Sequence, residues 1–211
     1  MKKHLLLLVI VALFVPSVIA QVPATVKLNT PNTDRGLSAM QAIQQRASAT
    51  AFSDKEVELQ DLSDLLWATN GINRPETGKR TAPSAMNCQD VDVYVILKAG
   101  AYLYDAKNHQ LTLVTEGDHR AFVSDRQANF ANAPVMLVMV SDIARFTRGD
   151  DASKLKMGAI DAGIVSQNAS IACAALGLKT RPRVSMNLEK LREVLKLSET
   201  QHPIINHPVS Y

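Results

Sequence analysis

Residues 155–177 read LKMGAIDAGIVSQNASIACAALG and carry the longest helical pattern in the chain. Small residues occupy nearly every side of this helix, namely Gly158, Ala159, Ala162, Gly163, Ala169, Ala172, Ala174 and Ala175. A helix that is apolar all round is buried, and small side chains allow another backbone or a flat ligand to approach closely. We therefore expect residues 155–177 to form a buried helix.

Strand patterns precede this helix. Valine or leucine stands at every second position from 91 to 97, and this period of two predicts a β-strand. Residues 101–104 and 110–114 flank a polar stretch at 105–109, which suits the turn of a β-hairpin. The run VMLVMV at 135–140 is continuously apolar, as expected of a central strand that is buried on both faces.

Two early helices are predicted by capping boxes, in which a hydroxyl and a carboxyl or amide group satisfy the first free N–H groups of a helix. Ser38 with Gln41 forms one such pair, and Ser53 with Glu56 forms the other. The second helix carries an apolar stripe of Leu59, Leu62, Leu65 and Leu66. We expect it to stop at Asn70-Gly71, with the glycine in the left-handed conformation.

Asn187 starts a short amphipathic helix at 188–197, and residues 203–209 are predicted as a final strand or arm. The order along the chain is therefore helices, then strands, then helices. This order favours an α+β fold with a mostly antiparallel central sheet flanked by helices.

The first twenty residues resemble a secretory signal peptide. Lys2 and Lys3 precede an apolar run at 5–15, and Val18-Ile19-Ala20 suits a cleavage site. The alternative is an uncleaved anchor, but the apolar run is shorter than the ~20 residues that a membrane span needs. We expect residues 1–20 to be a signal peptide, 21–37 an N-terminal arm and 38–211 one domain that is periplasmic or secreted, with no stable membrane anchor after cleavage.

Composition restricts the function further. The chain has 211 residues, of which 46% are hydrophobic and 20% charged, as in an ordinary globular domain. Its net charge of +3 includes Lys2 and Lys3, so the mature chain carries little net charge. It therefore lacks the excess of positive charge that is typical of nucleic-acid-binding proteins. Cys88 and Cys173 could form a disulfide in an oxidising compartment, but Cys173 lies in the predicted buried helix, and we favour two free thiols.

Several chemistries lack their motifs. The five histidines show no metal-ligand spacing, so a zinc site is not expected. The sequence contains no glycine-rich phosphate loop, no Gly-x-Ser-x-Gly turn and no Cys-x-x-Cys pair. Hydrolase and NTPase activities are therefore disfavoured.

Polar residues instead gather in three segments. Arg46 to Thr50 has an arginine and a serine that suit a phosphate, although a solvated helix end is the plainer interpretation. Lys79 to Gln89 precedes the first strong strand and is either a binding loop or a basic surface loop. Asp161 to Asn168 lies within the apolar helix, where its polar side chains either bridge helices or meet a ligand.

In this order and spacing, the segments resemble the FMN-dependent nitroreductase superfamily from about Leu37 to Val209. The closest likeness is to the branch with the azoline dehydrogenases (SagB-type), in which an Arg-Thr-x-Pro-Ser-Ala loop precedes a strand and a tyrosine-rich hairpin. The matching stretches here are RTAPSA at 80–85, VYV at 93–95, AYLYD at 101–105, EGD at 116–118, DAG at 161–163, QN at 167–168 and ALGL at 175–178.

The resemblance implies a homodimer joined through long central helices, with FMN bound at two sites that both subunits build. It implies a flavin-based reaction without catalytic side chains, because the cofactor itself stores the hydride. The substrate would be a nitro, quinone-like or other conjugated small molecule, and NAD(P)H is a possible donor. By the same resemblance, the cofactor-binding residues are Arg46, Ala47, Ser48 and Thr50 at the phosphate and ribityl chain, Pro83, Ser84, Ala85 and Asn87 from the partner subunit, and Arg183, Val184 and Ser185 at the flavin ring.

Two departures leave room for other functions. The family's phosphate motif usually ends in a second basic residue, where this chain has Thr50, and the C-terminal stretch from His202 to Tyr211 has no lysine or arginine. The leading hypothesis is an exported FMN-dependent oxidoreductase. The alternatives are a protein that binds flavin or another planar ligand without turnover, and a structural envelope protein.

Overall fold

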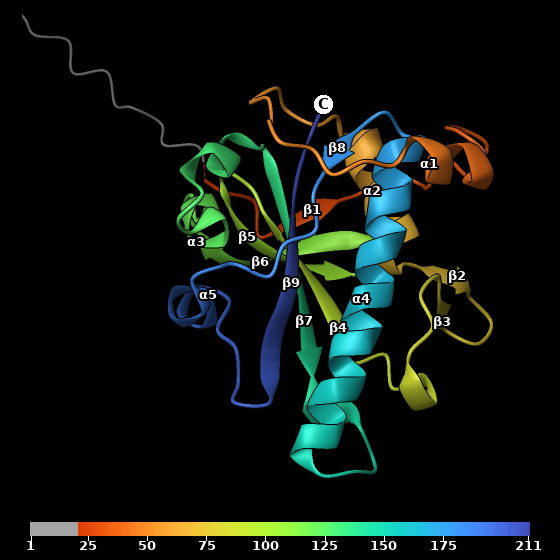
Figure 1. The fold of residues 1–211 in the computed structure, drawn as a ribbon, viewed down its shortest axis with the longest axis vertical. Coiled ribbons are helices and arrows are strands. Elements are labelled where there is room, and N and C mark those ends of the chain that lie inside the picture. Colours follow the sequence, from red (N-terminus) through yellow and green to blue (C-terminus); the bar gives the residue numbers. More distant parts are fainter. Residues whose placement is uncertain (1–20) are drawn as a thin grey trace, which may run out of the picture.

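The computed structural model describes residues 21–211, and the predicted signal peptide lies outside the described residues. Seven antiparallel strands form the main sheet in the order β1-β6-β5-β4-β7-β9-β8 (Figure 1). Their bounds are β1 (Thr25–Lys27), β4 (Val91–Ile96), β5 (Gly100–Asp105), β6 (Gln110–Glu116), β7 (Val135–Asp142), β8 (Lys179–Thr180) and β9 (Gln201–Ser210). The predicted α+β fold with a mostly antiparallel sheet is confirmed.

Helices cover both faces of this sheet. They are α1 (Ala39–Gln45), α2 (Leu59–Asn70), α3 (Arg120–Ser124), α4 (Asp151–Ala175) and α5 (Leu188–Val194). Three short 3-10 helices, η1 (Ala85–Asn87), η2 (Ala128–Asn132) and η3 (Ile143–Arg145), and a small hairpin of β2 (Ile72–Arg74) and β3 (Lys79–Arg80) complete the fold. Among the described residues, no helix is both long and apolar enough to cross a membrane.

Strand β7 separates two hydrophobic cores. Leu137 faces the core that α2 and α4 cover, whereas Met136 and Val138 face the core beneath α3 and α5. All three side chains are fully buried, and complete burial of an aliphatic side chain stabilises a fold by ~1.5 to 3 kcal/mol. The prediction of a central strand buried on both faces is confirmed.

The predicted hairpin is also present, as β5 and β6. In its turn, the Asp105 carboxylate accepts hydrogen bonds from the backbone N–H groups of Lys107 and Asn108 at 3.0 and 3.1 Å. These bonds close the turn, since a short acidic side chain can satisfy the N–H groups two and three residues ahead. The polar stretch between the two strand patterns therefore has a direct structural role.

The two early helices are present, but only one begins as predicted. Ser38 and Gln41 form the predicted capping box of α1. The Ser53–Glu56 capping box is wrong, because α2 begins at Leu59 after Glu58 and has no side-chain cap. Ser53 instead contacts the C-terminal end of the chain, where its N–H group donates to Ser210 Oγ at 3.2 Å.

Gly71 ends α2, but not in the predicted left-handed conformation. Its φ is −75°, which any residue can adopt. A Cβ atom at Gly71 would lie 2.6 Å from the carbonyl oxygen of Trp67. The glycine is therefore required by a close approach of the backbone rather than by its dihedral angle.

The long helix α4 is buried on one face only. Ala162, Val165 and Ala169 pack into the core, whereas Ala159, Ile160, Gly163 and Gln167 are exposed. The prediction of a helix buried on all sides is wrong for the single chain, because α4 lies on the outside of the sheet. Its apolar outer face remains available to another molecule.

The predicted N-terminal arm is attached to the domain. Its strand β1 pairs with β6, and Leu28 is buried in the core. Arg35 forms ion pairs with Asp61 and Asp64 of α2. The arm therefore extends the sheet at its edge and then crosses to the helical layer.

Both cysteines are free thiols, as favoured from the sequence. Cys173 is fully buried on α4, and burial raises the pKa of its thiol to about 12. A thiol with so high a pKa stays protonated and behaves as a small apolar side chain.

Candidate functional site

The segment Arg46 to Thr50 lies beside β8. Ser48 pairs with Thr180 in a parallel β-bridge, and the Ala49 N–H group donates to the Thr180 carbonyl oxygen at 2.9 Å. Together with the C-terminal half of α4, these segments enclose a cavity of about 460 Å³. Its lining residues are Gln45, Ala47, Ser48, Ala49, Thr50, Ala51, Ser170, Cys173, Ala174, Leu178, Lys179 and Thr180.

This cavity, which we call the β8 cavity, suits a small anionic group. Ser48 and Thr50 supply hydroxyl donors, and Lys179 is the basic residue of its lining. Hydrogen bonds from charged donors to phosphate oxygens are short and about twice as strong as neutral ones. Three of the predicted phosphate residues, Ala47, Ser48 and Thr50, therefore line one cavity.

Arg46 lies at the edge of this arrangement. It is half-buried, and its backbone N–H group closes α1 by donating to the Ala42 carbonyl oxygen at 2.8 Å. Arg46 does not line the β8 cavity in the single chain.

Arg183 is committed to the interior of the chain. Its guanidinium donates to the carbonyl oxygens of Val123 and Ser124 and to the side-chain oxygens of Gln127 and Asn206, at 2.9 to 3.1 Å. Its Cζ atom also lies 4.8 Å from the ring centroid of Phe130. These contacts engage four of the five N–H groups of the guanidinium and hold the side chain in the interior.

Val184 and Ser185 follow directly and are exposed, Val184 to 75%. The buried Arg183 and its backbone pairing with Asn206 anchor this exposed pair. Of the three residues predicted at the flavin ring, Val184 and Ser185 are therefore available at the surface.

The segment Pro83 to Asn87 forms a tight turn around η1. Met86, Asn87 and Gln89 have φ values of 53°, 53° and 49°, in the left-handed region that residues other than glycine rarely adopt. Pro83, Met86 and Asn87 are exposed. Strained backbone of this kind persists only where neighbouring groups hold it, and it is frequent at binding sites.

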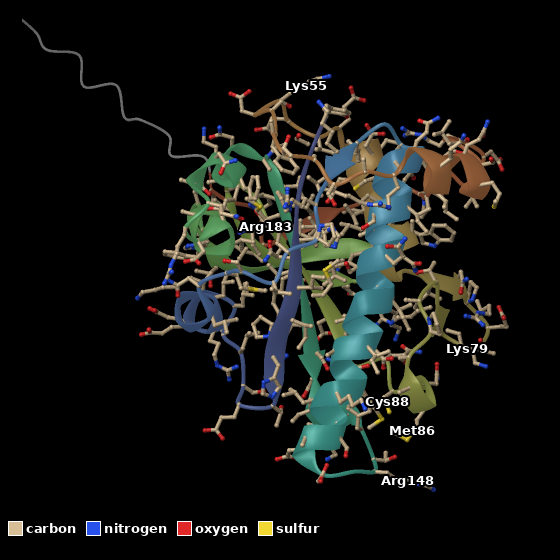
Figure 2. All side chains as sticks on the ribbon, in the orientation of Figure 1. Lys55, Lys79, Met86, Cys88, Arg148 and Arg183 are labelled. Atoms are coloured by element: carbon tan, nitrogen blue, oxygen red, sulfur yellow. The ribbon has the colours of Figure 1, made fainter. Side chains whose placement is uncertain are left out.

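The turn and the β8 cavity lie at different positions along α4. Asp161 contacts the turn, whereas Cys173 lines the cavity. Twelve residues separate these two positions, which is about 18 Å along a helix that rises ~1.5 Å per residue. Figure 2 shows Arg183 over the sheet and Met86 beyond α4. One chain therefore does not bring the predicted segments into one site.

Two buried polar clusters were not predicted from the sequence. Asp90 accepts a hydrogen bond from Ser141 Oγ at 2.6 Å, and burial raises the pKa of Asp90 to about 6. His207 lies between Ser166 and Thr180, at 2.7 and 3.0 Å, and burial lowers its pKa to about 3. The partners stand 27 to 51 positions apart in sequence, so no local pattern could have revealed them.

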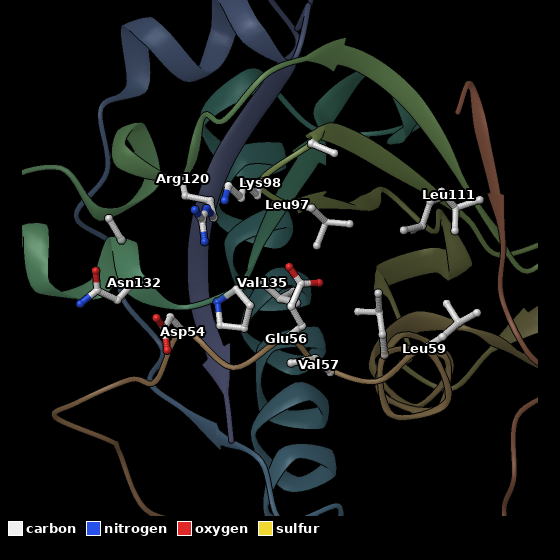
Figure 3. A pocket seen from close by; sticks show the side chains of 15 residues that line it. Asp54, Glu56, Val57, Leu59, Leu97, Lys98, Leu111, Arg120, Asn132 and Val135 are labelled. Atoms are coloured by element: carbon white, nitrogen blue, oxygen red, sulfur yellow. The ribbon is translucent and has the colours of Figure 1, made fainter. Parts of the chain in front are cut away.

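A larger cavity lies elsewhere, with a volume of about 690 Å³ (Figure 3). Leu59, Leu97 and Val135 belong to its apolar wall, and Glu56 and Lys98 are among the charged residues around it. None of the predicted site residues lines it. Within residues 21–211, no group of three or more His, Cys, Asp or Glu side chains is arranged to hold a metal ion.

Comparison with known proteins gives consistent results. The model of the nitroreductase family matches residues 43–211. A candidate nitroreductase of Methanocaldococcus jannaschii is 27% identical over 173 residues, which are 78% of this chain and 86% of that protein.

Among solved structures, a candidate nitroreductase of Ralstonia eutropha is 32% identical with a TM-score of 0.83, and 89% of each chain is covered. A chain of the Escherichia coli microcin synthetase complex McbBCD has a TM-score of 0.71 at 16% identity, with 95% of this chain and 77% of that one covered. The second likeness concerns the fold alone.

Proposed function

Because this chain belongs to the nitroreductase family, we propose that it is an exported, homodimeric FMN-dependent oxidoreductase that reduces or oxidises a conjugated small molecule. The observation that carries the proposal is the β8 cavity. It places Ser48, Thr50 and Lys179 around a space large enough for a phosphate and a ribityl chain. The proposed function therefore rests on a site in this chain and not on the fold alone.

The residues of the β8 cavity fit the charged end of FMN. Ser48 and Thr50 would donate hydroxyl hydrogen bonds to the phosphate, and Lys179 would supply positive charge where the family's second basic residue is replaced by Thr50. We also retain Arg46 as a phosphate contact in the dimer. Val184 and Ser185 would offer exposed backbone N–H groups to the flavin ring.

When bound, FMN supplies the hydride-transfer chemistry, and the chain binds, orients and shields it. The exposed Val184–Ser185 pair would restrict access to one edge of the ring, and its rigid anchor at Arg183 would keep that edge in position. We propose NAD(P)H as the donor and a nitro, quinone-like or other conjugated compound as the acceptor.

A second subunit would complete the site. Exposed apolar side chains gather on the outer surfaces of α1 and α4 and at η1, including Met40 at 76%, Ile160 at 56% and Met86 at 51% exposed. Apolar patches of this kind mark interaction surfaces. In the proposed dimer, α4 lies at the interface, and Pro83, Ser84, Ala85 and Asn87 reach the flavin of the partner subunit.

Within the family, we place the chain near the branch of azoline dehydrogenases. The ordered motifs from Arg80-Thr81 onward support this placement. The features of residues 1–20 support a signal peptide and a periplasmic or secreted location.

One spectroscopic experiment tests the proposal. Residues 21–211 are purified, and the visible spectrum is recorded with and without added FMN, followed by anaerobic addition of NADH or NADPH. We expect bound flavin that a nicotinamide nucleotide bleaches, in a dimer by light scattering. A colourless protein that stays colourless after reconstitution would overturn the proposal.

Thr50 favours a second function, because it removes a charge from the phosphate site. On this alternative, the protein binds flavin or another planar ligand without turnover. Flavin that binds to the protein but is reduced by neither NADH nor NADPH would support the alternative.

A further inference from the structure

The turn at η1 is held from beneath by a carboxylate of α4. Asp161 is 3% exposed, and its Oδ2 atom accepts a hydrogen bond from the Ala85 N–H group at 2.8 Å. Ala85 immediately precedes Met86 and Asn87, which both have φ values of 53°. The hydrogen bond therefore fixes the backbone at the residue that precedes the strained stretch.

Asp161 is itself backed by a second carboxylate. Asp90 is fully buried, it contacts Asp161, and its Oδ2 atom accepts from Ser141 Oγ at 2.6 Å. Its Oδ1 atom has no hydrogen-bond partner among residues 21–211. Burial, together with the neighbouring carboxylate of Asp161, raises the pKa of Asp90, because two adjacent buried carboxylates cannot both be charged at low cost.

The two neighbouring arginines donate their hydrogen bonds to other groups. Arg145 donates to the carboxylate of Asp92 and to the Gln89 carbonyl oxygen, at 2.5 to 3.0 Å. Arg80 donates to Gln89 Oε1 and to the Asn70 carbonyl oxygen, at 3.1 and 2.9 Å. Both arginines therefore brace the far end of the turn.

Gly158 makes this arrangement possible. It precedes Asp161 by three positions, on the same face of α4. A Cβ atom at Gly158 would lie 2.9 Å from Ser141 Cβ and 3.3 Å from Asp90 Oδ2. The glycine lets α4 approach β7 closely enough for Asp161 to meet Asp90.

We infer that Asp161, backed by Asp90 and Ser141, is a positioning residue that holds the Ala85–Asn87 turn in the shape it presents to the flavin of the second subunit. The role toward flavin rests on the proposed function. The contact by which Asp161 holds the turn is independent of the proposed function, because it lies within the single chain.

The test compares Asp161→Ala with Asp161→Asn in residues 21–211. In flavin-free protein, amide hydrogen exchange measured by NMR should accelerate at least tenfold at Ala85 in the alanine variant. The asparagine variant should stay within about threefold of wild type, since its amide oxygen accepts from Ala85 and its NH₂ group donates to Asp90. If Asp161→Ala does not fold, Asp161→Ser serves instead, because its hydroxyl is too short to reach the Ala85 N–H group.

Flavin titration supplies the second readout. The dissociation constant for FMN should rise at least tenfold in Asp161→Ala and be restored in Asp161→Asn. Thr69→Ala is the matched control: Thr69 is fully buried on α2 and donates to the Leu65 carbonyl oxygen, away from the turn. It should lower stability without changing exchange at Ala85 or flavin affinity.

Unchanged exchange at Ala85 in the alanine or serine variant would overturn the inference, as would an equal loss of flavin affinity in Thr69→Ala. Should the wild-type protein bind no FMN, the proposed function fails, while the exchange experiment still decides whether Asp161 holds the turn.

Discussion

Gly158 of α4 faces Ser141 of β7 with no room for a side chain between them. A Cβ atom at Gly158 would overlap Ser141 Oγ and lie 2.9 Å from Ser141 Cβ. The contact sets the distance between the longest helix and the central strand, and it brings the helix to the buried carboxylate of Asp90.

Gly158→Ala should therefore destabilise the protein. Alanine favours a helix over glycine by ~1 kcal/mol, but overpacking a tight interior contact costs ~1 to 3 kcal/mol and also disturbs the bond between Ser141 and Asp90. We expect a net loss in the free energy of unfolding, measured by urea denaturation. Gly163→Ala is the matched control, because a Cβ atom there meets nothing within 4 Å. A Gly158→Ala variant more stable than wild type would contradict the proposed packing.

His207 should make the fold less stable in acid. Its folded pKa of about 3 lies below the ordinary value of 6.5, so the unfolded chain binds a proton more readily. The contribution of His207 is complete above about pH 6.5 and is lost as the pH falls toward 3, by ~2 kcal/mol at pH 5. Urea denaturation of wild type and His207→Gln at pH 7.5 and 5 measures this. Equal pH dependence in the two proteins would show that His207 does not contribute.

Asp90 should act in the opposite direction. Its folded pKa of about 6 exceeds the ordinary 3.8, so the folded state holds the proton more tightly. Its contribution is complete below about pH 3.8 and is lost as the pH rises through 6, by ~2 to 3 kcal/mol. Asp90→Asn should remove this loss, because the amide accepts from Ser141 and carries no charge. We expect the variant to be more stable than wild type at pH 8, as measured by urea denaturation. Lower stability of the variant at pH 8 would argue against the raised pKa of Asp90.

Lys179→Ala should weaken FMN binding. Loss of one hydrogen bond to a charged group costs ~1.5 to 3 kcal/mol, which is a rise of about ten- to a hundredfold in the dissociation constant. Fluorescence titration measures the affinity, and Lys179→Arg should restore most of it. Lys190→Ala is a suitable control, since that lysine pairs with Glu193 on α5 outside the β8 cavity. Wild-type affinity in Lys179→Ala would show that another cation holds the phosphate.

Sequence patterns predicted the elements whose period is strong. The apolar run at 135–140 became β7, the polar turn at 105–109 closed the hairpin, and Asn187 began α5. Each depends on side chains close together in sequence, so each is encoded locally. The capping box at Ser53 failed because its serine is held by Ser210, 157 positions away.

Local patterns in this chain were enough to specify the α+β class, a mostly antiparallel sheet and the position of the small-residue helix, since periodicity distinguishes strands from helices. They did not predict that the Arg183 guanidinium donates hydrogen bonds to the carbonyl oxygens of Val123 and Ser124. They also did not predict that Lys179 and Ser48 line the same cavity, or that Asp90 lies beside Asp161. Those relationships join residues from distant segments, and they exist only once the sheet and α4 have packed together.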